Sequence, residues 1–191
     1  KLFPNENMKV SPAYLDNFIR QAKKRFDIIS ISEIEKYLQT STKKKFIVFT
    51  MDDGYKDNFT EALPVFKKYN VPFTIFTATN FPQKNAVLWW YELEDLLLAN
   101  DEIILSDGSK YNCTTKSEKE QVFLDIRHKI LALNQEDLVN ELNQLFCNYK
   151  IDWSAKCGEL CLSWEDLQEL NKEPLVTIAA HTAHHFNLKA L

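Results

Sequence analysis

Predicted strands and helices alternate along the first part of this 191-residue chain. The apolar run Phe46-Ile47-Val48-Phe49 opens a predicted buried strand over residues 46–51. Residues 57–69 then have helical periodicity, and residues 73–77 form a β-branched and aromatic strand. Because the connections are short, these strands are predicted to be parallel and joined by right-handed helical crossovers. The pattern predicts an α/β fold.

Local sequence patterns predict where several helices begin. Ser32 with Glu35 has the spacing of a capping box for a helix that ends near residue 39. Pro64 should kink the 57–69 helix or delay its true start. Ser163 caps a last short helix over residues 164–170, before the apolar run 175–180.

The middle of the chain interrupts the alternation of strands and helices. It contains an apolar helix over residues 88–98, a hairpin over 102–112, and helices over about 117–133 and 135–149. Between strands of a parallel sheet, such a block is predicted to be a helical insertion, covering residues 85–155. The length fits one domain, so residues 1–191 are predicted to form a single domain with this insertion.

Composition excludes few functions but gives no support to some. Hydrophobic residues make up 45% and charged residues 26%, which is typical of a globular protein. The net charge of −4 gives no reason to expect nucleic acid as a partner. No stretch approaches the ~18 apolar residues of a membrane-spanning helix, and no signal peptide is visible. The compartment stays open between the cytoplasm and the cell envelope of a bacterium, and so does the oligomeric state.

An acidic motif, Thr50-Met51-Asp52-Asp53-Gly54-Tyr55, closes the first buried strand. Adjacent acids on an extended strand face opposite ways, but the glycine frees the backbone, so both carboxylates could reach one cavity. One carboxylate can bind a cation while the other accepts a proton. A lone Asp-Asp-Gly also occurs in ordinary turns.

A histidine motif, His181-Thr182-Ala183-His184-His185, follows the last predicted strand. His181 and His185 are four residues apart, and His181 and His184 are three apart. Either pair would lie on one face of a helical turn and could chelate a metal. No glutamate stands beside His181, so this is not the His-Glu-x-x-His pattern of a metalloprotease.

Taken together, the two motifs predict a divalent metal site. One carboxylate and two imidazoles leave a fourth position open for water, the pattern of catalytic zinc; cobalt and nickel are alternatives. Such an ion activates water and polarises a carbonyl, and a second carboxylate could act as general base. The predicted chemistry is metal-assisted hydrolysis of an amide or ester.

In these motifs the chain resembles the NodB-homology polysaccharide deacetylases, a carbohydrate esterase family with the motifs Thr-Phe-Asp-Asp-Gly and His-Ser/Thr-x-x-His. The similarity extends to residues 62–74 and 162–167. The resemblance implies Asp53, His181 and His185 as metal ligands and Asp52 as the base. It implies a partial, distorted (β/α) barrel and an acetylated glycan or amino sugar as substrate.

The resemblance also suggests roles for four further residues. Thr50 and Thr182 are expected to form hydrogen bonds within the motifs, and Tyr55 is expected to line the cleft. His184 does not match a ligand position of the family, so it is expected beside the ligands or at the rim. The family's later elements, an Arg/Pro-Tyr segment and a late histidine acting as general acid, have no match here. The chain is therefore expected to be truncated after the second motif.

Three functions stay open from the sequence. The first is a polysaccharide deacetylase, a hydrolase acting on non-peptide carbon–nitrogen bonds. The second is a non-catalytic glycan-binding protein or an inactive truncated relative, and the third is a metal phosphoesterase. The sugar, its linkage, and the choice between N-acetyl and O-acetyl groups are not determined.

Overall fold

The computed structural model describes residues 1–40 and 45–190, which form two compact units. The sheet unit contains residues 10–85 and 158–185, and the helical unit contains residues 1–9, 86–157 and the residues from 186 onward.

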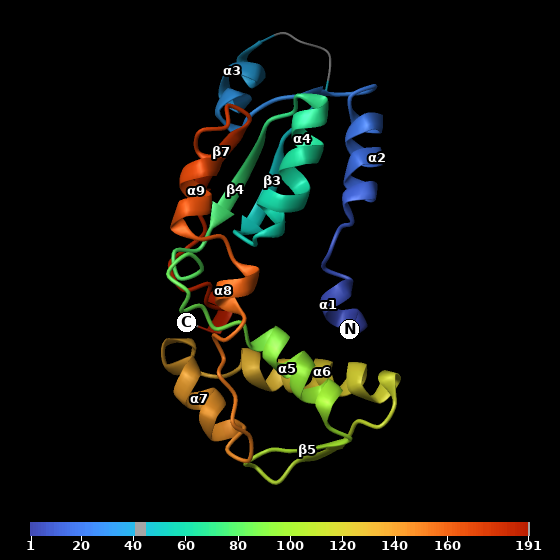
Figure 1. The fold of residues 1–191 in the computed structure, drawn as a ribbon, viewed down its shortest axis with the longest axis vertical. Coiled ribbons are helices and arrows are strands. Elements are labelled where there is room, and N and C mark those ends of the chain that lie inside the picture. The colour runs from blue at the N-terminus through green and yellow to red at the C-terminus, as the bar shows by residue number, and fades with distance from the viewer. Residues whose placement is uncertain (41–44, 191) are drawn as a thin grey trace. The chain divides into compact units, whose positions relative to one another are not determined.

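The sheet unit consists of short parallel strands and the helices that connect them (Figure 1). In chain order its elements are α2 (Pro12–Ala22), β1 (Asp27–Ile28), η1 (Ile31–Glu33), α3 (Ile34–Gln39), β2 (Phe46–Ile47), β3 (Phe49–Asp53), the π-helix η2 (Asn58–Ala62), α4 (Leu63–Tyr69), β4 (Phe73–Thr77), α8 (Cys157–Leu160, which starts at the boundary between the units), α9 (Trp164–Leu170) and β7 (Val176–Ala180).

The main sheet has the strand order β3-β4-β7, and both pairings are parallel. A separate parallel pair joins β1 to β2. The parallel crossovers predicted from the sequence are thereby confirmed, and the chain has an α/β fold. Within the described ranges no sheet closes on itself, so a distorted barrel is not confirmed.

Helices cover the face of the sheet that carries Phe73 and Ile75. These two side chains are almost fully buried and belong to a core that includes Phe66 of α4 and Leu167 of α9. The Phe66 and Phe73 rings stack with their centroids 4.2 Å apart. Because side chains alternate along a strand, this packing fixes which residues of β4 face the helices.

Two helix starts differ from, or refine, the sequence prediction. The capping box is formed by Ser30 and Glu33, not by Ser32 and Glu35, because the helical turn begins with η1. The helical segment predicted over 57–69 is present, but it begins with the π-helix η2, and Pro64 lies in the first turn of α4 directly after it.

The helical unit has a hydrophobic core of its own. Its elements are α1 (Phe3–Glu6), α5 (Trp89–Ala99), the antiparallel pair β5 (Glu102–Ile104) and β6 (Lys110–Asn112), α6 (Lys116–Leu131), η3 (Gln135–Asp137), α7 (Leu138–Leu145) and η4 (Leu188–Ala190). The predicted helices and the hairpin are confirmed. A single domain over residues 1–191 with an insertion at 85–155 stays a prediction.

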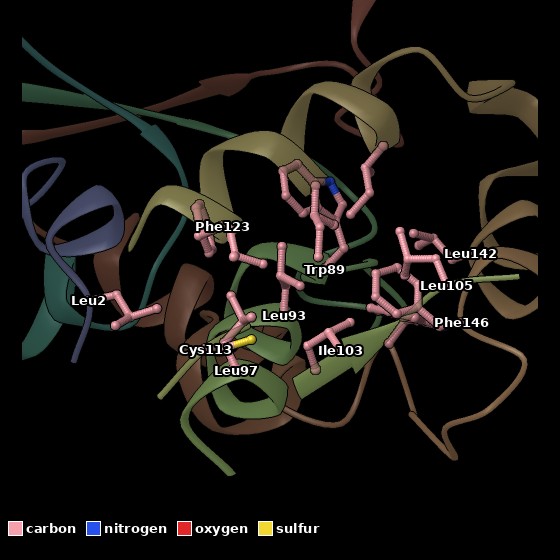
Figure 2. Close-up of a cluster of buried hydrophobic side chains, with 14 of the residues drawn as sticks. Leu2, Trp89, Leu93, Leu97, Ile103, Leu105, Cys113, Phe123, Leu142 and Phe146 are labelled. Atoms are coloured by element: carbon pink, nitrogen blue, oxygen red, sulfur yellow. The ribbon is translucent and has the colours of Figure 1, made fainter. Parts of the chain in front are cut away.

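Aromatic and aliphatic side chains fill the core of the helical unit, as Figure 2 shows. Trp89, Leu93 and Leu97 lie along one side of α5 and pack against Phe123 of α6 and Phe146 near α7. Trp89 is only 8% exposed, so the tryptophan that opens α5 belongs to the core. No helix among the described residues is long and apolar enough to cross a membrane.

A buried lysine, Lys119, donates hydrogen bonds to carbonyl groups at the C-terminal end of α5. The Nζ atom of Lys119 donates hydrogen bonds to the carbonyl oxygens of Leu97, at 2.5 Å, and Asn100, at 2.6 Å. Carbonyls at a helix C-terminus have no intrahelical partner, and an ammonium group also complements the helix dipole there.

We expect Lys119→Met to lower the free energy of unfolding by about 1–3 kcal/mol, because it leaves two carbonyls without their donor while the apolar stem is kept. Urea unfolding followed by circular dichroism measures the change. Lys116→Met on the same helix is the matched control, since the side chain of Lys116 is 69% exposed. Equal effects of the two substitutions would contradict the assigned role.

Candidate metal centre

The three strands of the main sheet end in one row. The register pairs Asp53 with Thr77, and Thr77 with Ala180, so the ends of β3, β4 and β7 lie side by side. The arrowheads of β3 and β4 point to the same end of the sheet in Figure 1. Because His181 directly follows Ala180, the acidic and histidine motifs flank the end of the central strand, β4. Carboxyl ends of parallel strands are where α/β folds place ligand sites.

The acidic turn has an unusual backbone. Asp53 has φ 73° and Gly54 has φ 90°, and a left-handed conformation at a non-glycine residue is uncommon. The carbonyl oxygen of Asp53 accepts hydrogen bonds from the Ala78 N–H, at 3.2 Å, and the Thr77 hydroxyl, at 3.3 Å. The left-handed residue ends the strand alternation, so the carboxylates of Asp52 and Asp53 no longer have to point in opposite directions.

The histidines lie in a loop and not on the helical turn expected from their spacing. The His181 N–H donates to the Thr77 carbonyl at 2.9 Å, which continues the pairing of β7 with β4. Thr182 and His185 then have φ 63° and φ 56°. The His185 N–H donates to the Thr182 hydroxyl oxygen at 3.1 Å, which closes the loop. Strained residues of this kind concentrate at functional sites.

These two turns bring three side chains together. The Nε2 atoms of His181 and His185 lie 3.5 Å and 3.0 Å from the same oxygen, Oδ1 of Asp53. Each of the three residues offers one atom that could bind a metal, and these atoms all lie within 4.8 Å of one another. The three side chains are 22–34% exposed, so they are partly buried but reachable from solvent.

The donor set fits a divalent ion. Bonds of about 2.0–2.2 Å from one metal to an oxygen and an imidazole nitrogen hold these atoms within about 4 Å of each other. Both separations from Asp53 meet that limit. Three protein ligands leave a coordination position for water or substrate, which structural zinc sites do not offer.

The remaining predicted residues differ in what they contact. Asp52 is exposed, and its carboxylate forms no hydrogen bond or ion pair with the described residues. Thr50 is also exposed, and its side chain forms no hydrogen bond with the described residues. The hydroxyl of Thr182, in contrast, accepts the bond from His185.

Tyr55 and His184 lie beside the three converging residues. The Tyr55 ring meets the buried Phe81 ring edge-on, with centroids 5.6 Å apart. His184 is exposed and is absent from the converging group; its Nδ1 lies 2.8 Å from the side-chain nitrogen of Asn80. The structure therefore separates His184 from His185, which the spacing alone could not do.

Sequence reasoning missed residues 77–81, which comprise the last residue of β4 and the loop after it. Besides Thr77 and Asn80, this segment contains Phe81, whose ring centroid lies 5.9 Å from that of His185. A signal was present in the sequence: polar residues Thr77, Thr79 and Asn80 lie at or just after the end of a buried strand, at the edge where parallel strands place ligand sites.

Comparison with a family model agrees with the motifs, and a solved structure was also found. The solved structure of the BpsB deacetylase domain from Bordetella bronchiseptica shares 16% identity with this chain, with a TM-score of 0.44. That match covers 91% of this chain and 44% of the other, so this chain spans less than half of that structure's length. The comparison with curated proteins gave no match. A family model described as polysaccharide deacetylase matches residues 39–191. Because the match covers well over half of the sequence, this chain belongs to the polysaccharide deacetylase family.

Proposed function

We propose that this chain carries the metal-binding part of a hydrolase that removes acetyl groups from a polysaccharide or other amino-sugar glycan. Asp53, His181 and His185 are the proposed ligands. The observation that carries the proposal is the approach of both imidazole Nε2 atoms to one carboxylate oxygen. Membership of the deacetylase family supports the choice of acetylated glycan as substrate.

Zinc is the proposed ion, because one oxygen and two nitrogen ligands in an open site are typical of catalytic zinc; cobalt and nickel accept the same ligands. When bound, such an ion lowers the pKa of a coordinated water to about 7 and polarises a carbonyl. The protein contributes the geometry, since the two turns with left-handed residues place the three proposed ligands close together.

Asp52 is the proposed general base. It is adjacent to Asp53 in the chain, but it is exposed and makes no ion pair with the described residues, so its carboxylate can accept a proton. Transfer of a water proton to Asp52 would accompany attack of the water oxygen on the acetyl carbonyl. The bond between the acetyl carbon and the sugar nitrogen or oxygen would then break to release acetate, and the proton held by Asp52 would pass to that nitrogen or oxygen.

The test separates metal binding from catalysis. Metal content and acetate release from acetylated chito-oligosaccharides are measured for the 191-residue chain and for any longer protein that contains it. We expect Asp52→Asn to keep the metal and to lower acetate release by about 10²–10⁴-fold, the usual contribution of a general base. His181→Ala should lose both.

Three results would contradict the proposal. Absence of bound metal in the wild type would remove its basis. Bound metal without acetate release from any acetylated glycan would favour a non-catalytic glycan-binding role. Phosphate release from a generic phosphodiester, together with no acetate release, would favour a metal phosphoesterase.

We also propose that β3, β4 and β7 are one arc of a distorted (β/α) barrel. Their parallel order, with α4 and α9 packed on one face, supports this. An experimental structure of a longer protein in which another strand pairs with the free edge of β7 would support the proposal. Coverage of that edge by a helix would contradict it.

A further inference from the structure

Residues 77–81, the last residue of β4 and the loop after it, contact both ligand-bearing turns although they contribute no ligand. On the acidic side, the Thr77 hydroxyl and the Ala78 N–H both donate to the carbonyl oxygen of Asp53. On the histidine side, the Thr77 carbonyl accepts the His181 N–H at 2.9 Å. The same residue thus touches one ligand through its side chain and a second through its backbone.

The rest of the segment continues along the histidine loop. The Thr79 N–H donates to the Thr182 carbonyl at 3.4 Å, and the Asn80 N–H donates to the Ala183 carbonyl at 3.0 Å. The Asn80 side chain adds the 2.8 Å bond to His184. Through these bonds, residues 77–81 hold the histidine loop along most of its length.

Both turns need such support. Asp53, Thr182 and His185 have positive φ, a conformation that disfavours residues with a Cβ atom and persists only when the surroundings enforce it. Thr182 is β-branched, for which a positive φ is a genuine outlier. The hydrogen bonds from residues 77–80 are among the contacts that oppose relaxation of the turns, and they are the ones that join the acidic turn to the histidine loop through one segment.

We propose that Thr77 and Asn80 are positioning residues for the metal centre: Thr77 holds Asp53, and Asn80 holds the loop that carries His181 and His185. This role rests on the proposed function, because it presumes that the three converging residues bind an ion. Residues that orient metal ligands without touching the metal commonly change metal affinity by 10–100-fold when replaced.

The first experiment compares two buried threonines of β4. Thr77→Val removes the hydroxyl that donates to Asp53 and keeps the shape of the side chain. Thr74→Val is the matched control: Thr74 is 1% exposed and Thr77 is 6% exposed, but the Thr74 hydroxyl has no hydrogen bond to the described residues of either motif. Thr77→Ser keeps a hydroxyl and tests for rescue.

Zinc affinity, measured by competition with a chromophoric chelator, is the principal readout, alongside the thermal midpoint of the zinc-free proteins. We expect Thr77→Val to weaken zinc binding by about 10–100-fold. Thr77→Ser and Thr74→Val should bind zinc as the wild type does. A purely structural role would instead lower the zinc-free midpoint and leave the affinity unchanged. The absorption of the cobalt-loaded proteins reports whether the coordination geometry changes with the affinity.

The second experiment uses a partly exposed side chain, so it stays informative if Thr77→Val does not fold. Asn80→Ala and His184→Ala remove the same hydrogen bond from opposite sides. We expect each to weaken zinc binding by up to about 10-fold, and the double variant to bind no more weakly than either single variant, because coupled residues are not additive.

The outcomes distinguish two kinds of failure. A wild type that binds no zinc overturns the proposed function itself. A wild type that binds zinc, with Thr77→Val and Asn80→Ala binding equally tightly, overturns only the positioning role. Equal loss of affinity in Thr74→Val and Thr77→Val also overturns it, because the effect would then come from general damage to β4.

Discussion

Replacing His185 with alanine is expected to weaken zinc binding by at least about 100-fold, more than the loss of a residue that only orients a ligand. The imidazole Nε2 of His185 lies 3.0 Å from Oδ1 of Asp53, the shorter of the two separations that define the centre. Without this ring, two protein ligands remain, which is fewer than catalytic zinc sites use. Acetate release should fall with the affinity.

His184→Ala is the comparison variant, because the neighbouring ring is exposed, does not belong to the converging group and is proposed to act only through its bond to Asn80. It should keep zinc binding within about 10-fold of the wild type, the lower limit for an orienting residue. Zinc content after dialysis and a zinc titration of each variant measure the difference. If His184→Ala lost zinc and His185→Ala kept it, the choice of ligand would be wrong.

Much of the sheet unit could be predicted from local patterns. The β-branched and aromatic run at 73–77 gave β4 at the right place, because buried strands of a parallel sheet are apolar throughout. The single buried strand predicted over 46–51 is instead two short strands, β2 and β3, which pair in different sheets. Ser163 capped its helix as expected, with its hydroxyl accepting from the Asp166 N–H. These features depend on neighbouring residues, which the sequence displays directly.

The capping box near residue 32 shows where local patterns become ambiguous. Ser30 with Glu33 has the same spacing as Ser32 with Glu35, and the second pair begins two residues after the first. The structure uses the first pair, because the backbone is extended at Ser30 and turns into η1 at Ile31. Which serine caps the helix depends on where β1 ends, and that is set by pairing with β2, a tertiary contact.

The candidate centre was predictable in composition but not in geometry. Residue types at strand ends gave the acids and the histidines, and the family resemblance selected His185 over His184. The left-handed backbone at Asp53 and His185 could not be read from the sequence, since both residues are ordinary in other conformations. The role of Thr77 was hidden for a related reason: it depends on the register that places Thr77 between Asp53 and Ala180.

Gly54→Ala is expected to lower the free energy of unfolding by about 2–5 kcal/mol. Two effects add. A left-handed backbone costs a residue with a Cβ atom about 1–2 kcal/mol, and Gly54 has φ 90°. A Cβ atom at this position would also lie 2.3 Å from the Thr77 hydroxyl oxygen and 3.0 Å from its Cβ atom. Relieving such overpacking costs about 1–3 kcal/mol.

The same substitution should disturb the metal centre, because the atom that must move is the hydroxyl that donates to the Asp53 carbonyl. We therefore expect zinc affinity to fall along with stability. Chemical unfolding of the zinc-free protein and a zinc titration of the folded protein measure the two effects separately.

Gly108→Ala is the control for backbone strain alone. Gly108 has φ 81°, and a Cβ atom there would meet nothing within 4 Å, so only the conformational cost of about 1–2 kcal/mol applies. It should leave zinc affinity unchanged.

A double-mutant cycle isolates the contact with Thr77. Thr77→Ala removes the hydroxyl oxygen 2.3 Å away and leaves the Cβ contact at 3.0 Å, so Gly54→Ala should cost less stability in the Thr77→Ala background than in the wild type. If the cost is the same in both backgrounds, or no larger than that of Gly108→Ala, then the close packing of Thr77 against Gly54 does not shape the acidic turn.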